Sequence, residues 1–285
     1  MHPSKASAAD RPVIILGSGR CGSTLLQAIL NTNPEFLIWG EHNGLLRQIA
    51  AAYFDIFGTI SNFPDELTLD AVDRMQRLKD RDRTTAWDNL FNREGLIERF
   101  RIFLRSMFAD PTGRCPRWGF KEIRYGRGSA DLVLPLLREC FPAVKFVFLV
   151  REPYSTLFSM LSAWFYVRTS RYSLIVAQAD RQILRLAHLW ARTYTYFHTY
   201  LHAYPSEATL VRYENLHQPE TYELLAHFLD TAAPFDYAPH VAMLKDAAVK
   251  DDETAAFIRE RINVMRPRID GVMRQTRLAF GYRDP

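Results

Sequence analysis

The residues GSGRCGST at positions 17–24 could form an anion-binding loop. They lie between two apolar runs, PVIIL and LLQAIL, a pattern that predicts a strand, a turn and a helix. Glycines in the loop allow successive backbone N–H groups to point into one concavity, and the helix start adds partial positive charge. The spacing is that of the P-loop G-x-x-x-x-G-K-[ST], except that Ser23 occupies the lysine position. We expect an anion site that Arg20, Ser23 and Thr24 supplement.

A second candidate anion site follows the apolar run KFVFLV, residues 145–150. Arg151 comes directly after this run, and Ser159 follows about two helical turns later. The carboxyl ends of parallel strands are the edge at which α/β sheets bind ligands. We therefore expect Arg151 and Ser159 to bind a second anionic group, although Arg151 could instead pair with a carboxylate.

The elements that position these residues alternate along the chain. Strands are expected at 12–16, 35–40, 117–124, 145–150 and 208–212, and helices at 23–30, from Ser129, from Pro153, at 174–203, from 219 and from 251. Between 42 and 108 the pattern is helical and charged. This alternation predicts an α/β fold with a central parallel sheet flanked by helices, P-loop-like. We expect a single domain over 1–285, with a flexible leader at 1–11 and a helical cap or insertion at 44–115.

The composition excludes several function classes. The net charge of +4 over 285 residues is too small to indicate nucleic-acid binding. The three cysteines show no metal-ligand spacing, which favours a reducing compartment and no metal site. No apolar stretch approaches the roughly 18 residues that span a bilayer. We expect a cytoplasmic protein without a membrane or nucleic-acid partner; the oligomeric state stays open.

Three segments resemble sulfotransferases that use 3′-phosphoadenosine 5′-phosphosulfate (PAPS). GSGRCGSTLLQAIL resembles their 5′-phosphosulfate loop, FVFLVREPYSTLFSM their 3′-phosphate motif, and TLVRYENLHQPETYELLAHFL their YED/YEN segment, whose tyrosine lies near the adenine. The closing FGY also resembles the ends of many members, whereas residues 44–115 and 232–275 match no motif of the family. The resemblance implies PAPS as donor, adenosine 3′,5′-bisphosphate as product, and no metal. The donor-binding residues it implies are Gly19, Arg20, Cys21, Gly22, Ser23, Thr24, Arg151, Ser159 and Tyr213.

Sulfuryl transfer needs a base for the acceptor's proton and positive groups near the leaving oxygen. Glu41, which follows FLIWG, resembles the glutamate of tyrosylprotein sulfotransferases, and Arg20 resembles the loop arginine of that group and of bacterial relatives. His42 is the second candidate base, since an unperturbed imidazole has a pKa of roughly 6.5. Lys121 resembles the lysine of a W-G-x-K strand, although a salt bridge to Glu122 or another acid is equally open. Arg124, expected on the same strand face, is a further candidate contact for donor or acceptor.

These features predict a sulfotransferase that acts on a hydroxyl or amine of a small-molecule acceptor. A P-loop kinase-like phosphotransferase and a non-catalytic nucleotide-binding module of the same fold are the alternatives. Residues 44–115 and Tyr166–Arg171 are expected to wall the acceptor pocket, with Tyr53, Phe54 and Phe57 suited to an apolar or planar acceptor or to a cap core. Lys250 is a candidate late contact to the 3′-phosphate. The acceptor's identity does not follow from the sequence.

Overall fold

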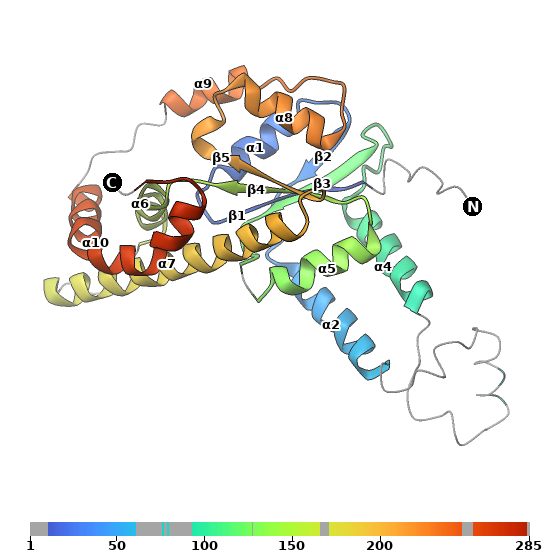
Figure 1. The fold of residues 1–285 in the computed structure, drawn as a ribbon, viewed down its shortest axis with the longest axis horizontal. Coiled ribbons are helices and arrows are strands. Elements are labelled where there is room, and N and C mark those ends of the chain that lie inside the picture. The colour runs from blue at the N-terminus through green and yellow to red at the C-terminus, as the bar shows by residue number, and fades with distance from the viewer. Residues whose placement is uncertain are drawn as a thin grey trace.

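Five parallel strands form one central sheet (Figure 1). The computed structural model describes residues 11–60, 76, 79, 93–126, 128–165, 171–246 and 253–283. The strand order is β2-β3-β1-β4-β5. The strands are β1 Val13–Gly17, β2 Phe36–Trp39, β3 Arg117–Glu122, β4 Lys145–Val150 and β5 Ala208–Arg212.

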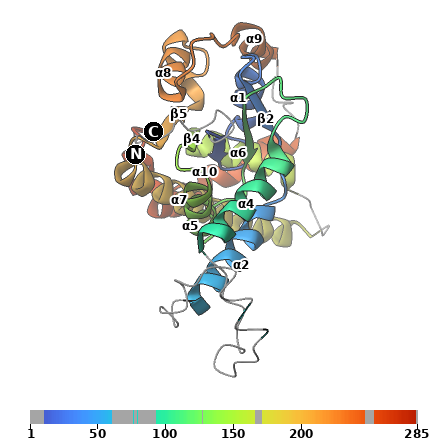
Figure 2. The same cartoon turned by 90° about the vertical axis from the view of Figure 1, so that its right-hand side faces the viewer.

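Helices cover both faces of the sheet, as the two ribbon views show together (Figures 1 and 2). One face carries α1 Ser23–Leu30, α8 Pro219–Leu229 and α9 Ala238–Asp246. The other carries α2 Leu45–Ile60, α4 Arg93–Phe108, α5 Ala130–Cys140, α6 Pro153–Trp164, α7 Tyr172–Ala203 and α10 Glu253–Ala279. The longest pair, α7 and α10, packs side by side along this second face.

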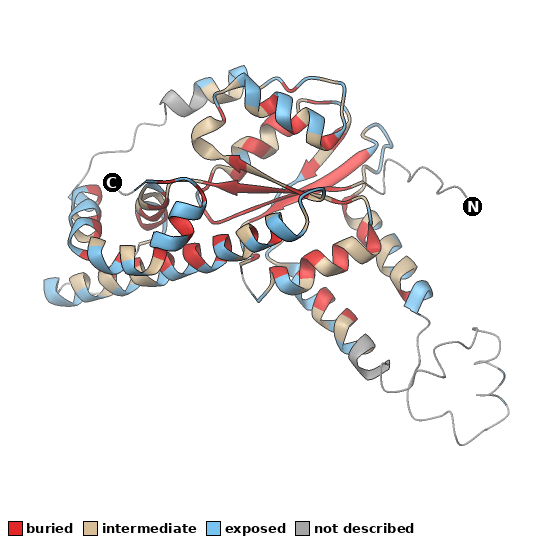
Figure 3. Ribbon diagram, viewed as in Figure 1, coloured by how far each residue is buried: buried red, intermediate tan, exposed pale blue. Residues whose placement is uncertain are grey.

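The central strands are apolar on both sides because each side meets a helical layer (Figure 3). Successive side chains of a strand point to opposite faces. Val13 and Ile15 of β1 accordingly join the core under α1 and α8, whereas Ile14 and Leu16 join the core against α5, α7 and α10. This double burial explains why the strands read in the sequence as continuous apolar runs.

The helices that follow β1 and β4 lie on opposite faces of the sheet. The helix that follows β1 packs on one face, with Leu26 and Ile29 in its core, and the helix that follows β4 packs on the other, with Leu157 and Met160. These two strands are neighbours in register, with Gly17 opposite Leu149. Ligands of open α/β sheets bind where outgoing connections diverge in this way, beyond the carboxyl ends of the strands. The loops after β1 and β4 therefore lie at the expected binding edge.

The predicted α/β architecture is confirmed, and all five expected strands are present with ends shifted by at most two residues. Ser129 occupies the N-cap position of α5, but its side chain makes no capping hydrogen bond there. No helix among the described residues combines the length and the hydropathy needed to cross a bilayer.

The single-domain organisation and the cap at 44–115 stay predictions. Four sets of residues with predicted roles lie outside the described residues: 1–10 of the expected leader, 61–75, 77–78 and 80–92 of the expected cap, 166–170 of the expected pocket wall, and Lys250. Within the described part, α2 and α4 contribute Tyr53 and Leu104 to the same core as β3 and α5.

Candidate active site at the carboxyl edge of the sheet

The loop after β1 has the conformation of an anion cradle. Arg20 and Gly22 adopt positive φ angles of 63° and 95°, which turn the chain sharply before α1 begins at Ser23. The N-cap residue Gly22 has no side chain to accept from the first N–H groups of α1. Helix N-termini of this kind offer backbone donors and partial positive charge to an anion. The loop itself is anchored from below by Tyr194, whose hydroxyl accepts from the backbone N–H of Ser18 at 3.1 Å.

Two aromatic side chains pack closely on glycines of the loop. A Cβ at Gly22 would lie 2.4 Å from Cδ2 of Tyr213, and one at Gly19 would lie 2.3 Å from Cη2 of Trp164. Cys21 is fully buried and its thiol lies against Gly17, on the core side of the turn. Cys21 can therefore contribute only its backbone to a ligand in the loop.

The loop after β1 and the segment after β4 are joined by hydrogen bonds. Nε of Arg20 donates to Oγ of Ser159 at 3.2 Å, and a terminal nitrogen of Arg151 donates to the carbonyl oxygen of Arg20 at 3.1 Å. The guanidinium of Arg151 also lies over the ring of Tyr213, 4.3 Å from its centroid. Residues from three separate segments of the sequence thus meet at one place.

The start of α6 is fixed by Glu152, which the sequence analysis did not single out. Its carboxylate accepts from the backbone N–H groups of Tyr154 at 3.1 Å and Ser155 at 2.6 Å, and Pro153 occupies the first helical position. Side-chain caps of this kind stabilise a helix by about 1 kcal/mol. The cap holds Arg151 and Ser159 at opposite ends of two helical turns.

Glu41 lies beside the loop and forms two ion pairs. Nζ of Lys121 donates to its Oε1 at 2.6 Å, and a terminal nitrogen of Arg124 donates to its Oε2 at 2.6 Å. Nζ of Lys121 also donates to Oγ1 of Thr24 at 3.0 Å, which connects the pair to the first turn of α1. Partial burial alone would raise the pKa of Glu41, but the hydrogen bonds from Lys121 and Arg124 lower it. Glu41 is therefore held as a carboxylate.

Lys121 forms the salt bridge to an acid that the sequence left open. Its partner is Glu41 and not Glu122, because neighbouring side chains of a strand point to opposite faces of the sheet. The expectation that Arg124 shares the strand face of Lys121 was wrong, since β3 ends at Glu122. Arg124 nevertheless reaches Glu41 from the loop that follows the strand.

Glu122 instead organises the backbone behind Glu41. Its side chain is fully buried, and its Oε2 accepts from the backbone N–H groups of His42 at 3.3 Å and Gly44 at 2.9 Å. Its Oε1 accepts from the backbone N–H groups of Ile123 at 2.9 Å and Arg124 at 3.2 Å, and from the Arg124 guanidinium at 3.0 Å. One carboxylate thus fixes both segments that carry the ion-paired groups. Only its place in the buried strand β3 could have indicated this role.

His42 is turned away from the loop after β1. Its Nδ1 accepts from the backbone N–H of Leu45 at 3.1 Å, so its proton is on Nε2, which lies 3.2 Å from the hydroxyl of Tyr125. Its ring packs against Phe120 and Phe108, and its side chain is only 10% exposed. Burial lowers the pKa of His42 from its ordinary value of 6.5, against the opposing effect of Glu122.

Most of the predicted site residues lie together at one edge of the sheet. This edge carries the loop at 17–24, Glu41, Lys121, Arg151, Ser159 and Tyr213. The imidazole of His42 packs against Phe108 and Phe120 instead. Among the described residues, no three His, Cys, Asp or Glu side chains are grouped so that they could hold a metal ion.

A family model described as "Sulfotransferase family" matches residues 12–233 of this sequence. The chain belongs to the sulfotransferase family. No curated protein sequence matches it.

Solved structures with a similar fold include other sulfotransferases. The sulfotransferase domain of the olefin synthase from Synechococcus PCC 7002 is 16% identical, with 82% of this chain and 78% of that chain covered and a TM-score of 0.48. A sulfotransferase from Alicyclobacillus acidocaldarius is 15% identical, with 93% and 96% covered and a TM-score of 0.46. A mouse sulfotransferase complexed with PAP is 9% identical, with 96% and 88% covered and a TM-score of 0.45. Membership of the family depends on the family model and not on these distant likenesses.

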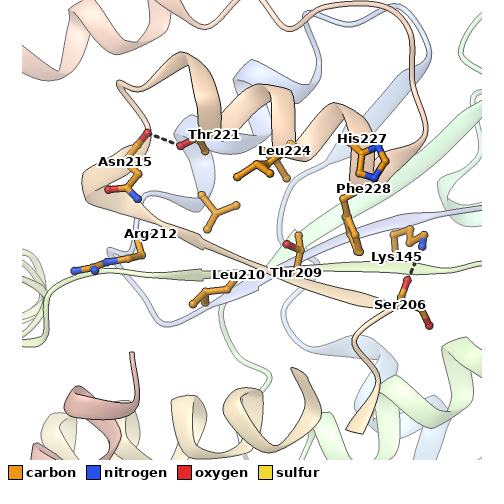
Figure 4. A pocket seen from close by; sticks show the side chains of 12 residues that line it. Lys145, Ser206, Thr209, Leu210, Arg212, Asn215, Thr221, Leu224, His227 and Phe228 are labelled. Carbon is orange, nitrogen blue, oxygen red and sulfur yellow. Dashed lines mark hydrogen bonds between the residues drawn. The ribbon is translucent and has the colours of Figure 1, made fainter. Parts of the chain in front are cut away.

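The sulfotransferase also has a cavity of about 590 Å³ between β5 and α8 (Figure 4). Lys145 and Ser206 lie at one end of it, and Arg212 and Asn215 lie at the other. None of the donor-site or catalytic candidates lines this cavity. It is therefore a feature separate from the cluster around Glu41.

Proposed function

We propose that this sulfotransferase takes its sulfuryl group from PAPS and transfers it to a hydroxyl or amine of a small-molecule acceptor. One observation carries the proposal: Arg20 of the first loop is hydrogen-bonded to both Arg151 and Ser159 of the second. A nucleotide with phosphates on both its 5′ and 3′ oxygens can therefore contact both segments at once. A nucleoside triphosphate carries no 3′-phosphate for Arg151 and Ser159 to bind.

The residues fit the donor group by group. The backbone N–H groups at the start of α1, with the hydroxyls of Ser23 and Thr24, suit the 5′-phosphosulfate. Arg151 and Ser159 suit the 3′-phosphate, since a guanidinium and a hydroxyl are both donors to phosphate oxygens. Tyr213, packed between Arg151 and the loop, suits the adenine ring.

In this proposal the protein supplies a base and positive charge. Bound PAPS provides an activated sulfuryl group, which the acceptor oxygen or nitrogen gains as the bond from sulfur to the 5′-phosphate oxygen breaks. Glu41 accepts the proton that the acceptor loses. In this proposal Lys121 and Arg20 stabilise the negative charge that develops on the leaving nucleotide.

Geometry favours Glu41 over His42 as the base. The Glu41 side chain is 26% exposed and joined to Thr24 of the loop through Lys121, whereas both nitrogens of His42 are engaged by Leu45 and Tyr125. A base must reach the proton that it removes within hydrogen-bonding distance. The imidazole of His42 faces buried aromatic rings instead of the loop.

The experiment compares Glu41→Gln with wild type in both turnover and nucleotide binding. We expect Glu41→Gln to lose turnover by on the order of 10²–10⁴-fold, with the affinity for adenosine 3′,5′-bisphosphate largely retained. Glu98→Gln is the matched control, because Glu98 pairs with Arg101 on the surface of α4. Unchanged turnover in Glu41→Gln would contradict the assignment of the base.

Thermal unfolding with ligands tests the donor itself. A ligand at a hundred times its Kd stabilises the native state by about 2.7 kcal/mol. We expect this stabilisation with adenosine 3′,5′-bisphosphate and not with ATP and Mg²⁺. Stabilisation by ATP and Mg²⁺ alone would favour the phosphotransferase alternative, and bisphosphate binding without turnover on any acceptor would favour the non-catalytic one. A cytoplasmic location also belongs to the proposal.

A further inference from the structure

The last described residues of the chain return to the sheet next to the proposed donor site. Helix α10 ends at Ala279, and Gly281, two residues further on, adopts a φ of 74°. The backbone N–H of Gly281 donates to the carbonyl of Leu278 at 2.9 Å, and that of Tyr282 donates to the carbonyl of Arg277 at 3.1 Å. These paired bonds form a Schellman motif, which requires a left-handed residue at the glycine position. The motif turns Tyr282 back towards β5.

Tyr282 is held there on two sides. Its hydroxyl donates to Oε2 of Glu214 at 2.8 Å, and the guanidinium of Arg212 lies over its ring, 4.2 Å from the centroid. The residue is only 6% exposed. Burial, together with the neighbouring Glu214 carboxylate, raises the pKa of Tyr282, so its hydroxyl stays a neutral donor.

Glu214 carries the connection onward to the segment after β4. Its second oxygen, Oε1, accepts from the backbone N–H of Glu152 at 2.7 Å. Glu152 is the residue that caps α6, and it directly follows Arg151. The carboxylate of Glu214 therefore joins Tyr282 to the turn between β4 and α6.

The bond between Glu214 and Glu152 lies next to the stacked pair of Arg151 and Tyr213. Arg151 directly precedes Glu152, and Tyr213 directly precedes Glu214. The guanidinium of Arg151 lies over the ring of Tyr213. Fixing one pair of neighbours therefore fixes the relative position of the other pair.

We propose that Tyr282 and Glu214 are positioning residues for the nucleotide end of the donor site. The inference depends on the proposed function, since it assigns Arg151 and Tyr213 to the 3′-phosphate and the adenine. Glu214 orients the turn that carries Arg151, and Tyr282 orients Glu214. Neither residue touches the reacting groups. Their loss weakens nucleotide binding and raises the KM for the donor, while kcat for bound substrates is preserved.

Tyr282→Phe is the test, because it removes only the hydroxyl. Without the hydroxyl, Glu214 loses a hydrogen bond that orients it, and the turn that carries Arg151 is held less firmly. We therefore expect on the order of tenfold weaker binding of adenosine 3′,5′-bisphosphate. Tyr200→Phe is the matched control: Tyr200 donates to Glu207 at 3.1 Å, just before β5 begins, at the strand end opposite Glu214. Titration calorimetry on the full chain measures the affinities, and thermal unfolding measures stability.

The outcomes separate this inference from the proposed function. Weaker bisphosphate binding in Tyr282→Phe but not in Tyr200→Phe, with a higher KM for PAPS at unchanged kcat, supports the positioning role. Equal affinities in wild type and Tyr282→Phe would overturn it, even if Tyr282→Phe lowered the melting temperature, because a purely structural role moves stability alone. A wild-type protein that does not bind the bisphosphate at all would overturn the proposed function first. Glu214→Gln is the second variant, and in it Tyr282→Phe should add little further loss.

Discussion

The buried carboxylate of Glu122 gives the sharpest test of how the candidate site is held together. Replacing it by glutamine keeps the size of the side chain but exchanges one oxygen for an NH₂ group. Each oxygen accepts from at least two backbone N–H groups, so either orientation of the amide places donors against donors. The variant also loses the charge that pairs with Arg124. Glu122→Gln should therefore destabilise both segments that carry the Glu41 cluster.

The size of the effect follows from burial. The Arg124 side chain is 45% exposed and keeps its ion pair with Glu41, so the loss comes mainly from the backbone donors that faced the buried carboxylate. Leaving a buried donor without its acceptor costs about 1–3 kcal/mol, and either orientation of the amide leaves two of them without one. For a chain of this size 1 kcal/mol shifts the melting temperature by roughly 2–4 °C. We therefore expect Glu122→Gln to melt on the order of 10 °C below wild type in differential scanning calorimetry.

A surface variant provides the control for Glu122→Gln. Glu98→Gln removes a carboxylate whose side chain is 46% exposed and whose partner, Arg101, lies on the same helix. Exposed pairs of this kind contribute at most about 1 kcal/mol, so its melting temperature should stay within a few degrees of wild type. If Glu122→Gln unfolds at the same temperature as Glu98→Gln, the assignment of Glu122 as the organising acceptor is refuted.

Three further predictions concern the loop, the cysteines and pH. Gly19→Ala should destabilise the protein, and Trp164→Ala should largely rescue it, because the added methyl collides with the indole alone; urea denaturation of the single and double variants measures this. Cys21, which is fully buried and whose pKa burial raises to about 11, should react with a thiol reagent only after unfolding, whereas the more exposed Cys115 reacts in the native protein; mass spectrometry of the labelled peptides decides. Folding lowers the pKa of Glu41, so the ionised carboxylate stabilises the native state at pH values above its ordinary pKa of 4.5, and this stabilisation is lost as the pH falls through the lowered pKa. Wild type and Glu41→Gln should therefore converge in unfolding free energy at acid pH. Unfolding free energies of the two proteins that run parallel over the whole pH range would contradict this.

The sequence predicted the sheet well because buried parallel strands are unmistakable as short apolar runs. KFVFLV became β4 at the expected residues, and α1 begins at Ser23 and ends at Leu30 as expected. The turn at 17–24 was equally easy to predict, since the spacing of its glycines reflects local backbone geometry. In both cases the information is contained in a few consecutive residues.

Side-chain partners were harder to predict, because they depend on contacts distant in sequence. Nothing local distinguishes Glu41 from Glu122 as the partner of Lys121 until the face of each β3 residue is known. The bond from Glu152 to Glu214 joins residues 62 positions apart. A sequence pattern can place such residues near the site, but only the folded chain shows which of their atoms meet.

The pairing of β1 with β4 sets the distance between the loop at 17–24 and the turn at Arg151. Neighbouring strands lie about 4.8 Å apart whatever is inserted between them in the sequence, so the distance between Gly17 and Val150 is independent of the length of the chain that connects them. Strands β2 and β3 lie on the side of β1 that faces away from β4. The segment of sequence between β2 and β3 can therefore change in length while the spacing between the loop at 17–24 and the turn at Arg151 stays constant. In the proposed function, such changes would alter the acceptor without altering the donor site.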